Sequence, residues 1–439
     1  MKLSAILTAC LASFAIAEVA VSSTDAAISA FKSPTICDPS VKQTSGYIDT
    51  ASDRHYFFWL FEARHQDRGN APLILYLNGG PGVSSLAAML MENGPCRMSA
   101  NDTEPVFNPY SINDRAHVIY VDVPPNTGFS NGTNTFNAMD IGADMDRFMH
   151  KFYTKFPKYR ASKLHIFGES FAAHFVAASG HAIRNRPQLE SIGIGNGFIS
   201  PYHHTESYAK MACNSTYGQV LPTEQCQQLD HIFQTECKPT IARCYQTLDK
   251  DDCNAALNRC WAPQLGLFYR SGVNSYDVRT KCEEGFLCYT VYNTIEKYFN
   301  KPDVQAALGV NQAFQKLNMD IYMGYRQSGD WMSPAYVRLI PGLLRKGIRV
   351  LVYAGDADFV CNWYGTKAWM KDLDWYSKPA FNAAPDRAWS VDGKAAGEVR
   401  SAGPLTFARI FEAGHSPSYD LPRPFQALTN RWLSNQPIV

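Results

Sequence analysis

The chain has 439 residues, of which 46% are hydrophobic and 18% are charged, and its 41 Lys and Arg residues nearly balance its 40 Asp and Glu residues. This length excludes a small disulfide scaffold, and the composition is that of a packed globular protein rather than a disordered one. A net charge of +1 argues against non-specific nucleic-acid binding and against polybasic attachment to a membrane.

The N-terminal residues predict secretion. Lys2 precedes an apolar run over residues 3–16, and residues 15–17 (Ala-Ile-Ala) fit a signal-peptidase site before Glu18. A membrane anchor is the weaker interpretation, because a spanning helix needs roughly 18 apolar residues. We therefore expect residues 1–17 to be a cleaved signal peptide. The mature chain is expected to be secreted, with an acidic storage compartment such as a vacuole as the alternative destination.

Twelve cysteines are present, and Cys10 lies within the expected signal peptide. The remaining eleven, in an oxidising pathway, predict paired disulfides plus one free thiol. A zinc site is a poor interpretation of the dense stretch between Cys213 and Cys288, because it has no CxxC pair and His231 is its only histidine. Three Asn-x-Ser/Thr sequons, which are expected N-glycan sites in a secreted chain, begin at Asn101, Asn131 and Asn214.

The first large part of the chain, residues 18–200, alternates short apolar strands with helical segments. We expect strands at 55–61, 73–77, 118–121 and 163–167, and helices at 139–156 and 171–181. Continuous apolar runs such as 73–77 are typical of strands buried on both faces. The alternation therefore predicts an α/β fold with a mostly parallel sheet and helices on both faces.

The alternation of strands and helices stops over residues 201–300, which are rich in cysteine and show no clear series of strands. We interpret this part as a cap inserted over the core and stapled by disulfides, since it has little core of its own. The α/β rhythm resumes over 301–439, with strands expected at 348–353 and 405–411 and helices at 363–373 and 422–433. The core is thus expected to have two parts separated by the cap.

A serine follows the expected strand 163–167, within the segment Gly168-Glu169-Ser170-Phe171-Ala172. A serine on a tight strand-to-helix turn presents its hydroxyl above the sheet, near the amides that begin the helix. Small residues flank such a turn because it brings backbones close together. This pentapeptide is a weak signal alone, since similar segments occur often by chance.

Two further residues stand at strand ends in the order that a serine triad requires on such a sheet. Asp358 follows the expected strand 348–353, and His415 follows the expected strand 405–411. A lone aspartate there is usually a turn residue, and a lone histidine is usually structural. All three residues at successive strand ends predict a serine hydrolase.

A glycine-rich loop, residues 78–85, follows the expected strand 73–77. Its glycines would let backbone N–H groups approach a developing oxyanion. A phosphate-binding loop is the alternative interpretation, but the segment lacks the Lys-Ser/Thr ending of that motif.

Four ordered motifs, residues 78–86, 168–170, 354–363 and 413–415, together resemble the serine carboxypeptidases. The resemblance covers nearly all of the mature chain, and residues 92–96 (Glu-Asn-Gly-Pro-Cys) are most similar to the secreted fungal branch. It implies an α/β-hydrolase fold and the removal of single residues from the C-termini of peptides or proteins in acid. It implies neither a metal nor an organic cofactor.

Position by position, the resemblance implies that Ser170 is the nucleophile and that His415 is the general base and then the acid. Asp358 would be the acid that orients His415, because the family motif places it three residues before Cys361. Asp356 would be its neighbour and not a member of the triad.

The resemblance also implies that the amides of Gly80 and Phe171 form an oxyanion hole. It assigns the grip on the substrate's terminal carboxylate to four residues, Asn78, Gly79, Glu92 and Glu169. A carboxylate facing two acidic side chains would be repelled at neutral pH. If Glu92 and Glu169 lie together, one or both must hold a proton, because burial and a like charge raise the pKa of a carboxyl group. We therefore expect peptide hydrolysis that is best at acidic pH, where His415 must still act as a base.

The cysteines match the family as well. The resemblance implies a free thiol at Cys361 near the site and the disulfides Cys213–Cys226, Cys237–Cys260, Cys244–Cys253 and Cys282–Cys288. Val83 stands where many members have a bridging cysteine, which leaves Cys37 and Cys96 as the fifth pair. Ser416 stands where many relatives have a methionine, so the pocket for the leaving residue is expected to be more polar.

Two other kinds of function stay open at this point. One is an esterase, acyltransferase or lyase on the same fold, which would not need the group around Glu92 and Glu169. The other is a binding protein without catalysis, against which the intact triad residue types argue.

Overall fold

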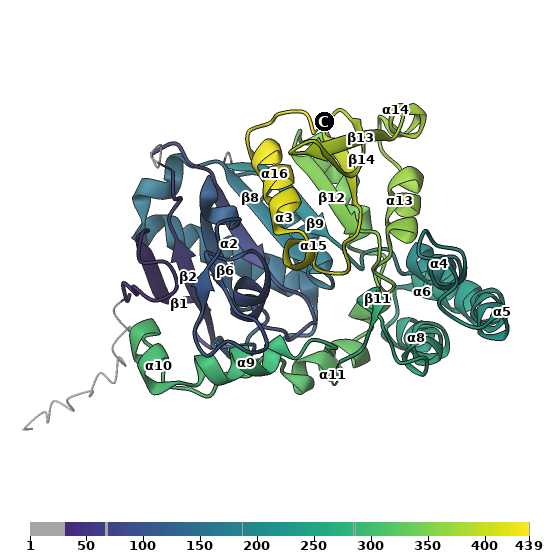
Figure 1. Ribbon diagram of the computed structural model, residues 1–439, viewed down its shortest axis with the longest axis horizontal. Helices are drawn as coiled ribbons and strands as arrows, with labels where there is room; N and C mark the ends of the chain where they lie inside the picture. The colour runs from purple at the N-terminus through teal and green to yellow at the C-terminus, as the bar shows by residue number, and fades with distance from the viewer. Residues whose placement is uncertain (1–30, 66–68, 187, 284, 286, 439) are drawn as a thin grey trace, which may run out of the picture. The chain divides into compact units, whose positions relative to one another are not determined.

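One large sheet runs through the part of the chain that the computed structural model describes, namely residues 31–65, 69–186, 188–283, 285 and 287–438 (Figure 1). The expected signal peptide, residues 1–17, lies outside these residues. The strands of the large sheet are β1 (Gln43–Ala51), β2 (Arg54–Phe61), β3 (Leu73–Leu77), β6 (His117–Val121), β7 (Asn131–Gly132), β8 (Leu164–Glu169), β9 (Leu189–Gly195), β12 (Arg349–Gly355), β13 (Arg387–Val391), β14 (Lys394–Ala402) and β15 (Leu405–Ile410).

The sheet order is β1-β2-β6-β3-β8-β9-β12-β15-β14-β13, with β7 paired to β2. The six neighbouring strands from β6 to β15 are parallel. Antiparallel strands flank them, with β1 and β2 at one edge and β14 and β13 at the other. This arrangement confirms the predicted mostly parallel sheet, and it brings the carboxyl ends of β8, β12 and β15 to one edge.

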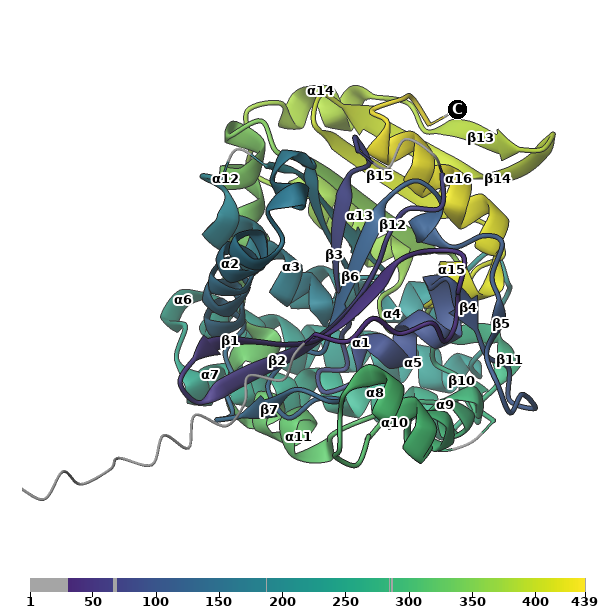
Figure 2. The same ribbon diagram turned by 90° about the vertical axis from the view of Figure 1, so that its left-hand side faces the viewer.

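Helices cover both faces of the sheet. The core helices are α1 (Ser85–Ala88), α2 (Ala138–Lys155), α3 (Ala172–Ile183), α10 (Pro302–Leu308), α11 (Met319–Gln327), α12 (Ile340–Arg345), α13 (Trp363–Asp372), α14 (Lys378–Ala383), α15 (Pro417–Asp420) and α16 (Pro422–Leu433). Figure 2 shows α2, α3 and α12 on one side of the sheet, and α15 and α16 on the other.

Strand β3 illustrates why the central strands are continuous apolar runs. Leu73, Leu75 and Leu77 pack in the cluster with α2 and α3, whereas Ile74 and Tyr76 pack in the cluster with α1 and α16. Successive side chains of a strand point to opposite faces, so a strand covered on both faces must be apolar at every position.

The segment after β9 carries the helices α4 (Pro201–Cys213), α5 (Thr223–Ile232), α6 (Lys238–Thr247), α7 (Lys250–Ala256), α8 (Ala262–Tyr269) and α9 (Val291–Phe299). Helices α4, α5, α6 and α8 gather beside one end of the sheet in Figure 1. Leu229, Phe233 and Leu265 of this segment are buried in the same cluster as α2 and α3. A short hairpin of β10 (Val273–Asn274) and β11 (Asp277–Lys281) also lies here, where no strand was expected.

Five disulfides join the described residues, and they are Cys37–Cys96, Cys213–Cys226, Cys237–Cys260, Cys244–Cys253 and Cys282–Cys288. Cys37–Cys96 ties the first described residues to the small ribbon of β4 (Cys96–Arg97) and β5 (Val106–Phe107). Cys361 is buried and carries a free thiol. Among the described residues, none of the helices combines the length and hydropathy that crossing a membrane requires.

Candidate active site

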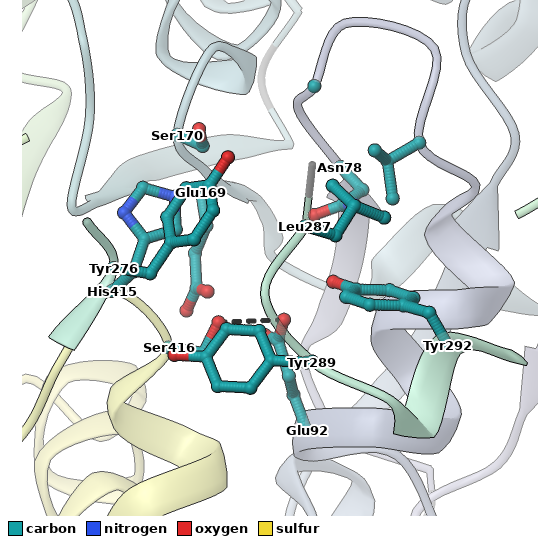
Figure 3. Close-up of a pocket in the computed structure, with 12 residues that line it drawn as sticks. Asn78, Glu92, Glu169, Ser170, Tyr276, Leu287, Tyr289, Tyr292, His415 and Ser416 are labelled. Carbon is teal, nitrogen blue, oxygen red and sulfur yellow. Dashed lines mark hydrogen bonds between the residues drawn. The ribbon is translucent and has the colours of Figure 1, made fainter. Parts of the chain in front are cut away.

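Ser170 occupies a sharp turn between β8 and α3. Its φ of 64° lies in the left-handed region, which is unusual for a residue with a side chain. Its backbone N–H donates to the carbonyls of Gly195 at 3.0 Å and Asn196 at 3.1 Å, so the end of β9 holds the strained turn in place. The turn presents Ser170 to a pocket at the carboxyl edge of the sheet (Figure 3).

His415 and Asp358 meet at the same edge. Nδ1 of His415 lies 2.8 Å from Oδ2 of Asp358, whose side chain is fully buried. Figure 3 shows the imidazole of His415 beside Ser170. The structure thus brings together all three residues that the sequence singled out, from the ends of β8, β12 and β15.

Asp356, two residues before Asp358, points to other partners. Its carboxylate accepts hydrogen bonds from the Arg409 guanidinium at 3.0 Å, the Glu412 backbone N–H at 2.9 Å and the Tyr217 hydroxyl. It therefore joins the strand ends to the segment after α4 and has no contact with the imidazole of His415 among these bonds.

The glycine-rich loop lies directly against the Ser170 turn. A Cβ atom on Gly79 would come within 2.7 Å of the Phe171 backbone nitrogen and 2.9 Å of the Ser170 Cβ, so a side chain there would displace the turn. Gly80 has a φ of 107°, which strongly favours glycine. The close approach sets the backbone of the loop beside the first amide of α3, the two sources of an oxyanion hole in this kind of site.

Two buried glutamates line the pocket in front of Ser170. Glu92 is 3% exposed and Glu169 is 2% exposed, and both line the pocket that contains Ser170. The Ser416 hydroxyl donates to Oε1 of Glu92 at 3.0 Å, and the Tyr353 hydroxyl donates to Oε1 of Glu169 at 3.0 Å. In the view of Figure 3, Ser170 lies at the upper left of the pocket and Glu92 at its bottom. Asn78 lies at the upper right, across the pocket from Ser170.

The electrostatics of this pair follow from burial. Burial raises the pKa of the Glu92 carboxyl above its usual range. Burial first, and then the charge of Glu92, raise the pKa of the Glu169 carboxyl well above its usual range. The pair therefore retains a proton at acidic pH, and a protonated carboxyl can donate a hydrogen bond.

The mouth of this pocket is aromatic. Tyr276, Leu287 and Tyr289, from the segment between α8 and α9, line it together with Tyr292 of α9 (Figure 3). The Tyr276 carbonyl accepts from the His415 backbone N–H at 2.7 Å, and the two rings lie 4.9 Å apart. The hairpin of β10 and β11 thus fixes the loop that carries His415.

A second cavity lies beside Ser170, lined mainly by aromatic side chains that include Phe171, Phe198, Trp261, Tyr322 and Trp331. Cys361 lines it as well. Burial raises the pKa of the Cys361 thiol well above its usual range, so the thiol stays protonated and is a poor nucleophile.

Of the described residues, one group could hold a metal ion, because ligand atoms of Asp358, Cys361 and His415 lie within 4.8 Å of one another. Two of these are the side chains joined by the short Asp358–His415 contact, so an ion bound here would compete with that contact.

Several site residues were missed by the sequence analysis. Asn196 donates from its side chain to Oδ2 of Asp358 at 2.8 Å, yet the strand β9 that places it was not predicted. Tyr353 and Tyr276 were passed over because a tyrosine in a strand or loop carries no motif. The expected glycan acceptors Asn101 and Asn214 are exposed, and Asn131 is partly exposed in β7.

Comparison with known proteins gives a consistent result. A family model described as serine carboxypeptidase matches residues 34–435. Carboxypeptidase Y of Komagataella phaffii is 39% identical over 401 residues, which cover 90% of this chain and 76% of the relative. Carboxypeptidase Y homolog A of Uncinocarpus reesii is 40% identical over 412 residues, which cover 91% of this chain and 75% of the relative.

Among solved structures, a prohormone-processing carboxypeptidase from Saccharomyces cerevisiae, Kex1(delta)p, matches with a TM-score of 0.75 at 24% identity. The match covers 92% of this chain and 94% of that one, which shows a shared fold.

Proposed function

The chain belongs to the serine carboxypeptidase family and is a serine-type carboxypeptidase, and from this premise we propose that it releases single residues at acidic pH through an acyl-enzyme on Ser170. The observation that carries the proposal is the buried pair of Glu92 and Glu169, which shares one pocket with Ser170. A pocket closed by protonated carboxyl groups accepts the free end of a peptide and little beyond it.

The proposed triad works as follows. His415 takes the proton of the Ser170 hydroxyl as the oxygen attacks the carbonyl carbon of the last peptide bond. Asp358 accepts a hydrogen bond from the Nδ1–H of His415, which leaves Nε2 free to act as the base, and it stabilises the imidazolium that forms. His415 then gives the proton to the leaving amine, and a water molecule hydrolyses the acyl-enzyme by the same steps in reverse order.

The negative charge on the carbonyl oxygen needs donors that are already in place. We assign this role to the backbone N–H groups of Gly80 and Phe171. The tight contact between the glycine-rich loop and the Ser170 turn supports the assignment, because preorganised donors need no rearrangement when the charge develops.

The substrate's terminal carboxylate is proposed to bind Glu92, Glu169 and Asn78, with the backbone N–H of Gly79 as a further donor. The raised pKa values of the two glutamates support this role, because a protonated pair can donate to a carboxylate that an ionised pair would repel. As the pH rises through these raised values the pair ionises, and binding of a free C-terminus weakens. The expected optimum is therefore acidic.

The two cavities would then hold the two residues of the scissile bond. The leaving residue would occupy the pocket with Ser416 and the three tyrosines. The residue on the acyl side would occupy the aromatic cavity that contains Trp261 and Trp331, which favours large apolar side chains.

We also propose secretion, with a vacuole as the alternative, and N-glycans on Asn101, Asn131 and Asn214. Five disulfides support an oxidising compartment, where such bonds persist. The positions of the three asparagines at or near the surface support their access to a glycosylating enzyme.

The test compares a blocked dipeptide that has a free C-terminal acid with its C-terminal amide, with Ser170→Ala as the blank. The proposal expects a strong preference for the free acid and labelling of Ser170 by a fluorophosphonate. Equal cleavage of acid and amide would instead favour an esterase or acyltransferase, and an unlabelled, inactive protein would favour a binding role.

A further inference from the structure

A histidine outside the proposed triad is buried one helical turn after Ser170. His174 of α3 is fully buried, and neither of its ring nitrogens has a hydrogen-bond partner among the described residues. A buried polar group without such a partner is destabilising, whereas an apolar ring of similar size would carry no such cost. Packing alone therefore does not explain a histidine at this position.

The ring of His174 packs against two aromatic rings and lies near a buried acid. Its centroid is 4.4 Å from that of Phe171, and it stacks on Tyr336 with the centroids 4.2 Å apart. Its Nδ1 lies 3.7 Å from Oδ2 of Asp330, which is within ion-pair range. Asp330 is itself 6% exposed, so the contact is shielded from solvent.

Asp330 is fixed from several sides. The Tyr336 hydroxyl donates to its Oδ1, and the Ala138 backbone N–H at the start of α2 donates to its Oδ2 at 3.4 Å. Its own N–H donates to the Ser328 hydroxyl at 3.1 Å. Asp330 therefore joins the segment 328–336 to α2 and, through His174, to α3.

The next residue, Trp331, is a wall of the aromatic cavity beside Ser170. Its ring lies 4.9 Å from Phe171 and 5.1 Å from Trp261, which line the same cavity. A shift of Asp330 would move Trp331 relative to Phe171, and Phe171 carries a proposed oxyanion donor. The contact between His174 and Asp330 is thus one of the links that hold this wall in place relative to Ser170.

We propose that His174 is a positioning residue, and that its contact with Asp330 sets the preference of the enzyme for the residue on the acyl side of the scissile bond. His174 does not touch the substrate. It holds Trp331 and Phe171 at the spacing that fits a large apolar side chain. The preference for the leaving residue, which binds on the far side of Ser170, does not depend on this contact.

The test measures kcat/KM of His174→Phe, Asp330→Asn and the double variant. The substrates are two blocked dipeptides that share one leaving residue and have Phe or Ala on the acyl side. His174→Phe keeps an aromatic ring and removes the nitrogens, and Asp330→Asn keeps the shape and removes the charge. Fluorophosphonate titration counts the active sites, so loss of folded enzyme does not enter the ratio.

Each single variant should lower the Phe-to-Ala ratio of kcat/KM by about 10-fold, since small changes in a hydrophobic pocket change discrimination by this order. The double variant should lower it no further than the larger single effect, because the two residues act through one contact. The preference among leaving residues should stay as in the wild type.

His165→Phe is the matched control. His165 is also a fully buried histidine with an unpartnered ring nitrogen among the described residues, but it lies on β8 and contacts Ser191. It should lower the melting temperature and leave the ratio unchanged. If His174→Phe does not fold, His174→Gln replaces it, and the test uses His174→Gln together with Asp330→Asn.

An unchanged ratio in titrated His174→Phe, additive effects in the double variant, or an equal change in leaving-residue preference would each overturn the inference. The inference rests on the proposed acyl-enzyme at Ser170. A wild-type enzyme that resists the fluorophosphonate would refute that proposal, whereas a labelled and active wild type with an unchanged ratio in the variants would refute only the role of His174.

Discussion

Oδ2 of Asp358 lies 2.8 Å from Nδ1 of His415, and the same oxygen accepts hydrogen bonds from the Asn196 side chain at 2.8 Å and from the Cys361 backbone N–H at 3.3 Å. Three donors on one carboxylate oxygen fix where it lies. They also favour the tautomer of His415 that carries its proton on Nδ1 and turns a free Nε2 toward the nucleophile.

Asp358→Asn should therefore lower kcat by about 10⁴-fold, because an amide at this position favours the wrong tautomer of His415. The measurement is kcat on a blocked dipeptide together with the rate of labelling by a fluorophosphonate. Asp356→Asn is the matched control, since Asp356 bonds Arg409 and Glu412 and not the imidazole. A similar loss of kcat in both variants would contradict the assignment of Asp358.

Glu169→Gln should flatten the pH dependence of KM. The pKa of Glu169 is raised by burial and by Glu92, so in the wild type its proton is present in acid and is lost as the pH rises. KM for a free-acid peptide should then increase as the pH is raised from acid through neutrality in the wild type. A glutamine keeps an N–H donor at every pH, so the increase should be smaller in the variant.

The C-terminal amide of the same peptide is the control for this experiment. It has no carboxylate to repel, so its KM should change little with pH in either enzyme. An identical KM profile for wild type and Glu169→Gln on the free acid would refute the donor role of the pair.

Much of this site could be predicted because its parts stand at the ends of strongly patterned strands. The apolar run of β3 has the bounds expected from the sequence, and α2 (Ala138–Lys155) was expected at 139–156. Chain order and strand ends were enough to find Ser170, Asp358 and His415, because parallel strands bring their carboxyl ends to one edge.

Strand β9 could not be predicted in this way. Its sequence contains Gly193 and Gly195, which lower strand propensity and suggest a loop. Tertiary packing leaves no room for a side chain at either glycine. A Cβ on Gly193 would lie 2.5 Å from the Phe167 ring, and one on Gly195 would lie 2.3 Å from the Tyr353 ring. The rings come from neighbouring strands, and without β9 the role of Asn196 stayed hidden.

The hairpin of β10 and β11 was missed for a different reason. Its second strand, Asp277–Lys281, is mostly polar, and it pairs over only a few residues. Its importance lies in Tyr276 at the turn, whose contact with His415 joins residues 139 positions apart in sequence (415 minus 276). No local pattern predicts a contact of that kind.

Asp122 should make the folded state more stable in acid. Its carboxylate is fully buried and accepts from the Ser84 hydroxyl at 2.6 Å and the Phe129 backbone N–H at 2.9 Å, and burial raises its pKa above the usual range of an aspartate to about 6. A raised pKa means that the folded state holds the proton more tightly than the unfolded state. The contribution of Asp122 to the free energy of unfolding is fully present below the pKa of an aspartate in the unfolded chain. It is lost as the pH rises through about 6.

The size of this contribution is about 3 kcal/mol, from roughly two pKa units at 1.36 kcal/mol each. Urea unfolding of the inactive Ser170→Ala background at pH values from about 4 to about 7 measures it. Adding Asp122→Asn should lower the free energy of unfolding overall and reduce its decrease with pH. A decrease of the same size with and without Asp122→Asn would show that another group is responsible.

Ser416 should set both the binding of the terminal carboxylate and the choice of leaving residue. Its hydroxyl donates to Oε1 of Glu92 at 3.0 Å and lines the proposed pocket for the leaving residue. Ser416→Ala removes only the hydrogen bond, which is worth about 1 kcal/mol and corresponds to an increase of about 5-fold in KM. Ser416→Met removes the same bond and adds a long apolar side chain.

Comparison of the two variants separates these effects. Relative to Ser416→Ala, Ser416→Met should raise kcat/KM for peptides ending in Leu and lower it for peptides ending in Ser, changing their ratio by about 10-fold. The acyl-side preference should stay the same in both, because the aromatic cavity with Trp331 does not include Ser416. If Ser416→Met changed the acyl-side preference instead, the two cavities would have been assigned to the wrong sides of the scissile bond.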